Sequence, residues 1–529
     1  MGEAVFARRA SGLVREASLL DTIFFGMMNN AVAVCVWFAI SSWYYYPGAN
    51  PWIVSALTLP FSLIFATVWG ILGGSMPRSG GSYVYNSRII HPTIGLAVSW
   101  ANAGFVMLAW IWVLAPWVGE VGLPIWASVM WQNPEAVSYW TYGVGLLIVS
   151  MIVNVVAFVV VMLGLRTYFR VQNVLVALQI LAVAMAAVIF MITPHQKFVE
   201  VFNHWASQYG SPSFDQTIAL TNAEWPIPET WNWSATIGEL VPFSWFAIYG
   251  YFITCICGEV KSPRKNVFLG QFLNILISSV LGIWCILAFY RMVGWEFLHV
   301  QAYIDNVYPD WWKMPIYSIY GCYAAMLTNF NPIVGFIMAA GYIGGDFLWV
   351  PASYIFFSRG LFAWGMDMLG PTWFTDVHPR FGTPVKLHLL TFILSSIILP
   401  QYCFWPEVYG AVSVETMQLV SVFGVTSISC MIFPFRKKVR DIWEASPYKT
   451  WKVGPIPYAT IAGALTLVYI GMLVYGSYSP EIMTGYMRIW TCIYIAVWAL
   501  GIAWYFIWKW YRAKQGIDVT LAFKELAPE

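Results

Sequence analysis

The segment Phe24-Phe25-Gly26-Met27-Met28-Asn29-Asn30-Ala31 places a glycine and two asparagines inside an apolar run that is long enough to cross a bilayer. A second segment in the other half of the chain, Phe246-Ala247-Ile248-Tyr249-Gly250-Tyr251-Phe252, interrupts an apolar run in the same way. Unpaired backbone groups are costly in lipid unless they line a cavity or are buried in protein. A matched pair of broken spans, one in each half, is typical of membrane carriers and indicates where a substrate binds.

The composition supports a membrane protein and excludes an ordinary globular enzyme. Of the 529 residues, 60% are hydrophobic and 10% are charged, and the mean hydropathy is +0.66. Soluble domains carry about 25% charged residues. The histidines are scattered and the cysteines lack the spacing of a metal site, so we expect neither a metal nor another cofactor. No phosphate-binding glycine loop is present, which argues against ATP-driven pumping, and no removable signal peptide is evident.

The apolar runs predict an all-α integral membrane protein with about twelve transmembrane helices of about 20 residues each. Basic residues gather in alternate loops, so the positive-inside rule puts both termini in the cytoplasm. We expect a multi-pass protein of the cell (plasma) membrane. The expected spans are residues 18–44, 51–74, 93–121, 139–165, 170–193, 235–257, 267–293, 331–357, 387–404, 413–435, 457–478 and 486–511.

The spans fall into two sets of five, separated by a long outer loop and followed by a further pair. Because five is odd, the second set enters the membrane from the opposite face, which predicts an inverted repeat. The expected parts are a cytoplasmic N-terminal segment (1–17), a first repeat (18–193), an extracellular loop (194–234), a second repeat (235–435), a basic cytoplasmic loop (436–456), a C-terminal helix pair (457–511) and a cytoplasmic tail (512–529). We also expect a short helix across the outer mouth within residues 315–330.

Three predicted cytoplasmic motifs point to a family. They are Ser75-Met76-Pro77-Arg78-Ser79-Gly80-Gly81-Ser82-Tyr83-Val84-Tyr85, then Gly258-Glu259-Val260-Lys261-Ser262-Pro263-Arg264-Lys265-Asn266, and finally Ser358-Arg359-Gly360 followed by His378-Pro379-Arg380-Phe381-Gly382-Thr383-Pro384. In their order and positions they resemble the amino acid permease branch of the amino acid–polyamine–organocation (APC) superfamily. The resemblance implies a LeuT-like five-plus-five fold and amino acid transport.

The resemblance also implies which residues bind substrate. The broken first span would offer backbone N–H groups to a carboxylate, and carbonyls of the sixth span would accept an ammonium, as the helix dipoles favour. Carried over, the substrate-binding residues are Gly26, Met27, Met28, Asn29 and Asn30, with Phe246, Ala247, Tyr249 and Gly250. This chain departs from the family in having a single glycine in the first break. Asn29 and Asn30 therefore either cap the broken helix or contact the ligand.

Isolated polar residues inside the spans indicate ion or proton coupling. Asp346 lies near the centre of the eighth span, where a carboxylate is a functional candidate by default. It could carry a proton, bind Na⁺, pair with a cationic substrate, or be protonated and hydrogen-bonded to a neighbouring helix. Gln179 stands where proton-coupled relatives can have a lysine, and Ser353 is a candidate Na⁺ ligand.

Charged residues next to the predicted inner loops suggest a cytoplasmic gate. Arg78 and Arg88 fit the inner interface, where Glu259 could pair with one of them. The alternative is that these charges only fix the topology.

The leading hypothesis is a secondary active permease, not an enzyme, that moves amino acids by alternating access, coupled to H⁺ or otherwise to Na⁺. A polyamine or organic-cation carrier of the same fold is an alternative, which Asp346, Glu120 and Glu239 would suit. A non-transporting nutrient receptor or structural subunit is a second alternative. The loop 122–138 contains no cysteine, so no disulfide-linked ancillary subunit is expected there, and neither is a nucleic-acid partner.

Overall fold

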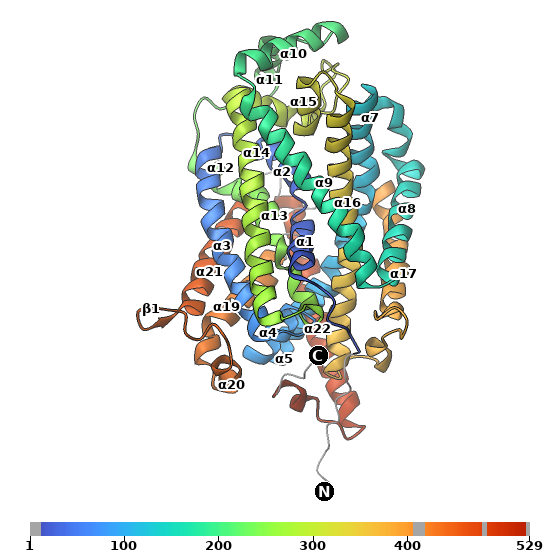
Figure 1. Ribbon diagram of the computed structural model, residues 1–529, viewed down its shortest axis with the longest axis vertical. Coiled ribbons are helices and arrows are strands. Elements are labelled where there is room, and N and C mark those ends of the chain that lie inside the picture. The colour runs from blue at the N-terminus through green and yellow to red at the C-terminus, as the bar shows by residue number, and fades with distance from the viewer. Residues whose placement is uncertain (1–11, 406–417, 479–483, 525–529) are drawn as a thin grey trace.

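The computed structural model describes residues 12–405, 418–478 and 484–524, which form a bundle of long helices with shorter helices at both ends (Figure 1). Within those residues, 11 helices are long and apolar enough to cross a membrane, or up to 12 if the bent pair Leu419–Phe435 and Lys437–Glu444 forms one span. The predicted all-α membrane class with about twelve spans is therefore confirmed. The first residues of the expected span 413–435 lie outside the described residues, and the inverted repeat stays a prediction.

The spans of the first half include one that is broken and one that is irregular. They comprise α1 (Leu19–Asn30) with α2 (Val32–Ser41), α3 (Pro51–Ser75), the composite Pro92–Trp131, α8 (Gly143–Met162) and α9 (Leu165–Ile192). The composite span consists of α5 (Pro92–Ser99), the π-helix η2 (Trp100–Val106), α6 (Met107–Trp117), the π-helix η3 (Val118–Gly122) and α7 (Leu123–Trp131).

The second half contains the most deeply buried span and the longest helix. Its spans comprise α12 (Trp233–Gly238) with α13 (Leu240–Ile248) and the 3₁₀ helix η5 (Tyr249–Glu259), then α14 (Pro263–Val307), α16 (Pro332–Met366), α17 (Val385–Phe404), the π-helix η8 (Leu419–Gly424) with α19 (Val425–Ile432), α21 (Tyr458–Tyr478) and α22 (Thr484–Ala513). The apolar window of the span Trp233–Glu259 is 100% buried against 17% for the last span, so the former lies at the centre of the bundle and α22 at its periphery.

Short elements cover the two ends of the bundle, as Figure 1 shows. At one end lie α10 (His195–Tyr209), α11 (Phe214–Glu224) and α15 (Tyr320–Leu327), the last within the residues expected to form a helix across the outer mouth. At the other end lie α4 (Ser82–Ile89), α20 (Arg440–Glu444) and a hairpin of β1 (Lys452–Val453) and β2 (Ile456–Pro457). The remaining short helices are η1 (Ser42–Tyr44), η4 (Pro134–Trp140), η6 (Thr372–Thr375), η9 (Phe433–Phe435), η10 (Lys437–Val439) and η12 (Val519–Phe523).

The first span begins at a strong cap and breaks at a single residue. Ser18 and Asp21 form a reciprocal capping box at the start of α1. The helix then continues through Gly26 to Asn30, and the break falls at Ala31, whose φ of 33° is left-handed. The N–H of Ala31 donates to the carbonyls of Met27 and Met28 before α2 begins. The residues expected to be interrupted are therefore helical, except for the last one.

Candidate functional site

The two broken spans meet at one side chain that the sequence analysis did not identify, Asn274 on α14. The Asn30 Nδ2 atom donates to Asn274 Oδ1 at 3.2 Å, and the Gly250 N–H donates to Asn30 Oδ1 at 2.7 Å. Asn274 Nδ2 in turn donates to the carbonyls of Gly270 and Gln271, each at 2.8 Å. Asn30 therefore connects the first break to the start of η5, where the α13 helix has just ended, and both are held against α14.

Glycine is required at positions 26 and 250 because Asn274 packs directly against both residues. A Cβ atom on Gly26 would lie 2.4 Å from Asn274 Cγ, and one on Gly250 would lie 1.8 Å from Asn274 Oδ1. Both distances are far below van der Waals contact, so neither position can hold a larger residue while Asn274 keeps its place. Gly26 and Gly250 thus serve close packing, and neither has a positive φ.

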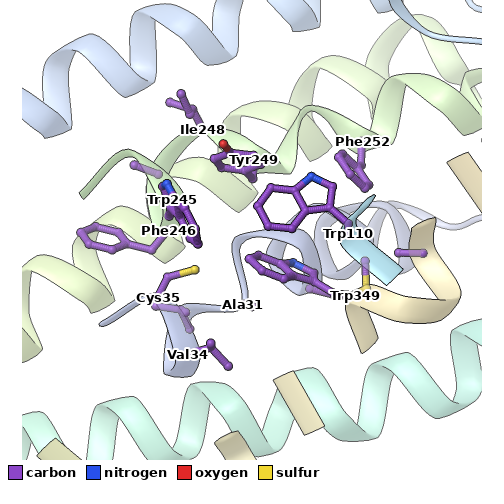
Figure 2. Packing of buried hydrophobic residues seen from close by; sticks show 14 of the residues in the cluster. Ala31, Val34, Cys35, Trp110, Trp245, Phe246, Ile248, Tyr249, Phe252 and Trp349 are labelled. Carbon is purple, nitrogen blue, oxygen red and sulfur yellow. The ribbon is translucent and has the colours of Figure 1, made fainter. Parts of the chain in front are cut away.

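A small cavity lies beside the breaks and is enclosed mostly by aromatic rings. Its volume is about 10 Å³, which is about the space of one water molecule, and it is lined by Asn29, Trp110, Leu114, Tyr249, Phe252, Trp349 and Ser353. Figure 2 shows Trp110 between Tyr249, Phe252 and Trp349. The Trp110 ring centroid lies 5.3 Å from that of Trp349 and 6.1 Å from that of Tyr249, so the rings form one packed cluster.

Asn29 supplies an unused hydrogen-bond acceptor at this cavity. Its Nδ2 atom donates to the Phe25 carbonyl at 2.9 Å, while its buried Oδ1 atom has no partner among the described residues. The backbone carbonyl of Asn29 accepts a 2.6 Å bond from Trp349 Nε1. The α1 terminus is therefore bound to α16 through Trp349, and a carbonyl oxygen remains available to a donor.

Asp346 lies on α16, one turn from the cavity. It shares a helix face with Tyr342, Trp349 and Ser353, which are spaced three to seven residues from it. Its side chain is fully buried, and neither carboxylate oxygen has a hydrogen-bond partner in the described part of the chain. Gln179 on α9 is also buried with both amide atoms unpaired in that part, and it packs against Gly345.

At the opposite end from α10 and α11, buried ion pairs join the motif loops. Arg78 and Arg88 both contact Asp367, at 3.1 Å and 2.9 Å. Burial alone would raise the pKa of Asp367, but the two arginines outweigh burial and hold that pKa below its usual value. Glu259 pairs with Arg359 at 2.9 Å, so the expected pairing of Glu259 with Arg78 or Arg88 is wrong. Arg359, which lies on α16, donates hydrogen bonds to both carboxylate oxygens of Glu259.

The glycine pair of the first motif brings this end of the chain against η5. Gly80 and Gly81 have φ values of 112° and 55°, which side chains other than glycine rarely adopt. Their N–H groups donate to the carbonyls of Cys255 and Thr254, each at 3.1 Å. This turn carries the chain from Arg78 into α4, so that Arg78 and Arg88 reach the same carboxylate.

Comparison with known families agrees with this arrangement. Residues 24–498 match the model of the amino acid permease family. The chain belongs to this family. No curated protein matches the permease. The resemblance to APC permeases is confirmed, and the family indicates a multi-pass membrane transporter of amino acids and not an enzyme.

The predicted substrate-binding residues of the permease do not all reach the cavity. Asn29 and Tyr249 line it, and so does Ser353 from the coupling set. Met28 accepts a hydrogen bond from Tyr168, and Phe246 packs against Gly282 on α14. The other predicted residues of the breaks, Gly26, Met27, Asn30, Ala247 and Gly250, are buried.

The sequence analysis did not single out several residues that form the site. Trp110 and Trp349 are two of 31 tryptophans, and no local pattern in the sequence distinguished them from interfacial ones. Asn274 had a usable signal, because Gln271, Asn274 and Ser278 form a polar stripe at helical spacing within an apolar span. Asp367 had none, since its partners Arg78 and Arg88 come from a distant part of the chain.

Proposed function

We propose that this permease is a secondary active transporter that carries amino acids across the cell membrane by alternating access, coupled to H⁺. The observation that carries the proposal is Asp346, a membrane-buried carboxylate whose oxygens have no hydrogen-bond partner among the described residues, one turn from the cavity beside the two breaks. A buried charge is expensive unless it is neutralised, so proton uptake and release there are coupled to what binds nearby.

The ammonium group of an amino acid suits the cavity beside the breaks. The unpaired Oδ1 of Asn29 is an acceptor, and ring faces such as those of Trp110 and Trp349 attract cations. The cavity holds only about one water, so the rest of an amino acid needs a rearrangement of the surrounding helices. The paired charges Arg78–Asp367 and Glu259–Arg359 keep the predicted cytoplasmic side closed until that rearrangement.

The second candidate is an organic-cation carrier of the same fold. The aromatic cluster favours it, because aromatic rings around a cavity attract organic cations without any need for a carboxylate-binding group. The single glycine of the first break points the same way, since bulkier neighbours limit access to backbone amides.

Uptake into proteoliposomes tests both candidates. Radiolabelled amino acids and organic cations are offered with an inward H⁺ gradient, an inward Na⁺ gradient or neither, to wild type and to Asp346→Asn. We expect accumulation of an amino acid under the H⁺ gradient and its loss in Asp346→Asn, whereas Asp376→Asn, which removes an exposed carboxylate, behaves as wild type. Accumulation of organic cations alone supports the second candidate. No accumulation of either class under either gradient contradicts the carrier function.

A further inference from the structure

A second cavity lies on the side of the bundle, against α22, and shares no residue with the cavity beside the breaks. Its volume is about 310 Å³, which is within the range of small-molecule sites. Its lining comes from η2, α6, α16, η6, α17 and α22, and consists of aromatic residues, leucines and one glycine. A buried water needs about three polar partners, so this cavity suits an apolar occupant.

Two tryptophans of the lining, Trp364 and Trp504, use their N–H groups within the protein. Trp364 Nε1 donates to Ser99 Oγ at 2.8 Å, and Trp504 Nε1 donates to the carbonyl of Leu369 at 2.7 Å. The ring centroid of Trp100 lies 5.4 Å from that of Trp364 and 4.8 Å from that of Trp504, so the three rings form one wall. A polar ligand would therefore gain no hydrogen bond from Trp364 or Trp504.

The cavity opens on the surface of α17 and α22 that faces lipid. Its floor belongs to α16, where Trp364 is 2% exposed, whereas Leu394 of α17 and Trp504 of α22 are half-buried and form the rim. On α17, Leu389 and Ile393 next to this rim are 46% and 48% exposed. Such side chains on a membrane-spanning helix contact lipid tails, which are as apolar as leucine. The cavity is thus continuous with the lipid interface, and an acyl chain is the apolar group that reaches it.

Basic residues of α22 lie beyond the cavity, toward the predicted cytoplasmic end. Lys509 follows Trp504 by five residues, about 8 Å along the helix, and Lys514 follows the end of the helix. Lys509 is exposed and belongs to none of the ion pairs in the described part of the chain. The sequence of α22 contains no acidic residue. This end of the helix therefore suits an anionic headgroup.

The wall formed by α22 is bound to the loop that follows Asp367. The three carbonyls of residues 368–370 all accept hydrogen bonds from α22, the middle one from Trp504 and the outer two from Arg512. Arg512 lies about two turns beyond Trp504 on the same helix. A group that fills the cavity would therefore support α22 against the loop next to the buried ion pairs of Asp367.

We propose that this cavity binds an acyl chain of an anionic phospholipid whose headgroup lies near Lys509 at the predicted cytoplasmic side. The bound chain packs against the wall of tryptophan rings and supports the closed end of the bundle through the contacts of α22. This site is separate from the cavity beside the breaks. Its existence does not depend on the substrate or the coupling ion proposed above.

Gly104, on η2, provides a variant that fills the cavity. In the described part of the chain, a Cβ atom there would meet only Trp364 Cη2, at 3.7 Å outside its own helix, so a leucine can extend into the cavity. The matched control is Gly471→Leu on α21, where a Cβ atom meets nothing within 4 Å. Lys509→Gln is a second variant, which alters an exposed side chain and leaves the cavity as it is.

Photolabelling of the full-length protein in phosphatidylcholine nanodiscs tests the site. The probe is phosphatidylglycerol with a diazirine in its acyl chain, and mass spectrometry of peptides locates the label. We expect strong label on the peptides that contain Leu394 and Trp504, its loss in Gly104→Leu, and wild-type label in Gly471→Leu. The peptide of Ile152, an exposed residue of α8, reports ordinary lipid contact and should be the same in all variants. Label at the cavity no stronger than at Ile152, or unchanged in Gly104→Leu, would overturn the proposal.

Competition tests the headgroup. Unlabelled phosphatidylglycerol should displace the label at about a fivefold lower mole fraction than the same amount of added unlabelled phosphatidylcholine requires, which is the effect of about one basic residue near a membrane surface. Lys509→Gln should abolish this difference. Equal displacement by the two lipids in wild type would overturn the assignment of an anionic lipid.

Two further measurements examine the occupant and its effect. Native mass spectrometry should show a retained lipid in wild type and its loss in Gly104→Leu, whereas a lipid-free dimer cross-linked through α22 would overturn the proposal in favour of a second copy of the chain. Phosphatidylglycerol added to delipidated wild type should slow alkylation of Cys257, a buried cysteine of η5. An unchanged rate of alkylation would overturn the support of the closed end.

Discussion

Replacing Asp367 by asparagine removes a buried carboxylate that pairs with two buried arginines. Arg78 and Arg88 contact Asp367 at 3.1 Å and 2.9 Å, and the three side chains are exposed by 2%, 1% and 0%. Breaking a buried ion pair by removing one partner costs about 3–5 kcal/mol, because the remaining charge is left uncompensated. Since 1.4 kcal/mol is about tenfold in an equilibrium constant, the closed arrangement at this end should lose more than about a hundredfold in its population.

Thermal unfolding and cysteine accessibility measure this loss. Cys257 is a buried cysteine on η5 that forms no disulfide and lies close to Tyr85 of α4, so opening of this end should expose it. We expect Asp367→Asn to lower the unfolding temperature and to speed alkylation of Cys257. Mass spectrometry of the peptide that contains Cys257 measures the alkylation rate. The matched control is Asp376→Asn, which breaks an exposed pair with Lys386 that contributes at most about 1 kcal/mol. Equal effects of the two substitutions would refute the reasoning.

The stability that Asp367 contributes should decrease as the pH falls. The folded protein lowers the pKa of Asp367 below its usual value of 3.8, so the unfolded chain binds the proton more readily. The stability contributed by this carboxylate is therefore fully present above about pH 5 and is lost as the pH falls through the folded-state pKa. The difference in unfolding temperature between wild type and Asp367→Asn should stay constant from pH 7 to about pH 5 and shrink in stronger acid.

Three further outcomes are expected. Gly250→Ala should greatly reduce the yield of folded protein, measured by size-exclusion chromatography, because its Cβ would lie 1.8 Å from Asn274 Oδ1. Adding Asn274→Ala should restore folding in part. The control Gly471→Ala, whose Cβ meets nothing within 4 Å, should leave the yield unchanged. Trp349→Phe should raise the KM for uptake several-fold, because it removes the 2.6 Å bond to the Asn29 carbonyl and leaves a ring in place. Phe523→Ala should speed alkylation of Cys257 modestly, since the Phe523 ring covers the Arg88 guanidinium at 5.3 Å; an unchanged rate would show that the C-terminal segment does not stabilise the closed end.

Much of the fold was predictable because transmembrane helices are determined by local composition. Long apolar runs gave the all-α class and the number of spans, and the polar interruptions identified both broken spans. The exact position of the first break was harder to predict from the sequence. The glycine at position 26 suggested a break there, but Gly26 stays helical to accommodate Asn274, and the left-handed residue is Ala31. Which of these residues leaves the helix depends on tertiary packing, which a local pattern does not contain.

The candidate site was predictable to the extent that single polar residues in apolar spans are conspicuous. Asp346 was chosen in this way; its side chain is fully buried, and its role in coupling stays a prediction. The pairing of charges was not predictable, because it depends on which helix ends meet. Glu259 had several arginines within plausible reach along the predicted inner face, and the structure joins it to Arg359. The aromatic lining of the cavity was equally hidden, since tryptophan is abundant throughout the chain.

The contact of one asparagine with two distant glycines also constrains how this protein can evolve. Gly26 and Gly250 lie in different spans, yet a side chain at either one requires Asn274 to become smaller or move. Asn274 in turn cannot be lost without releasing Asn30, its partner at the first break. Substitutions at these positions are therefore epistatic: a change that is harmful alone becomes acceptable only after another. Lineages that diversify their substrates should keep the set intact or replace its members together.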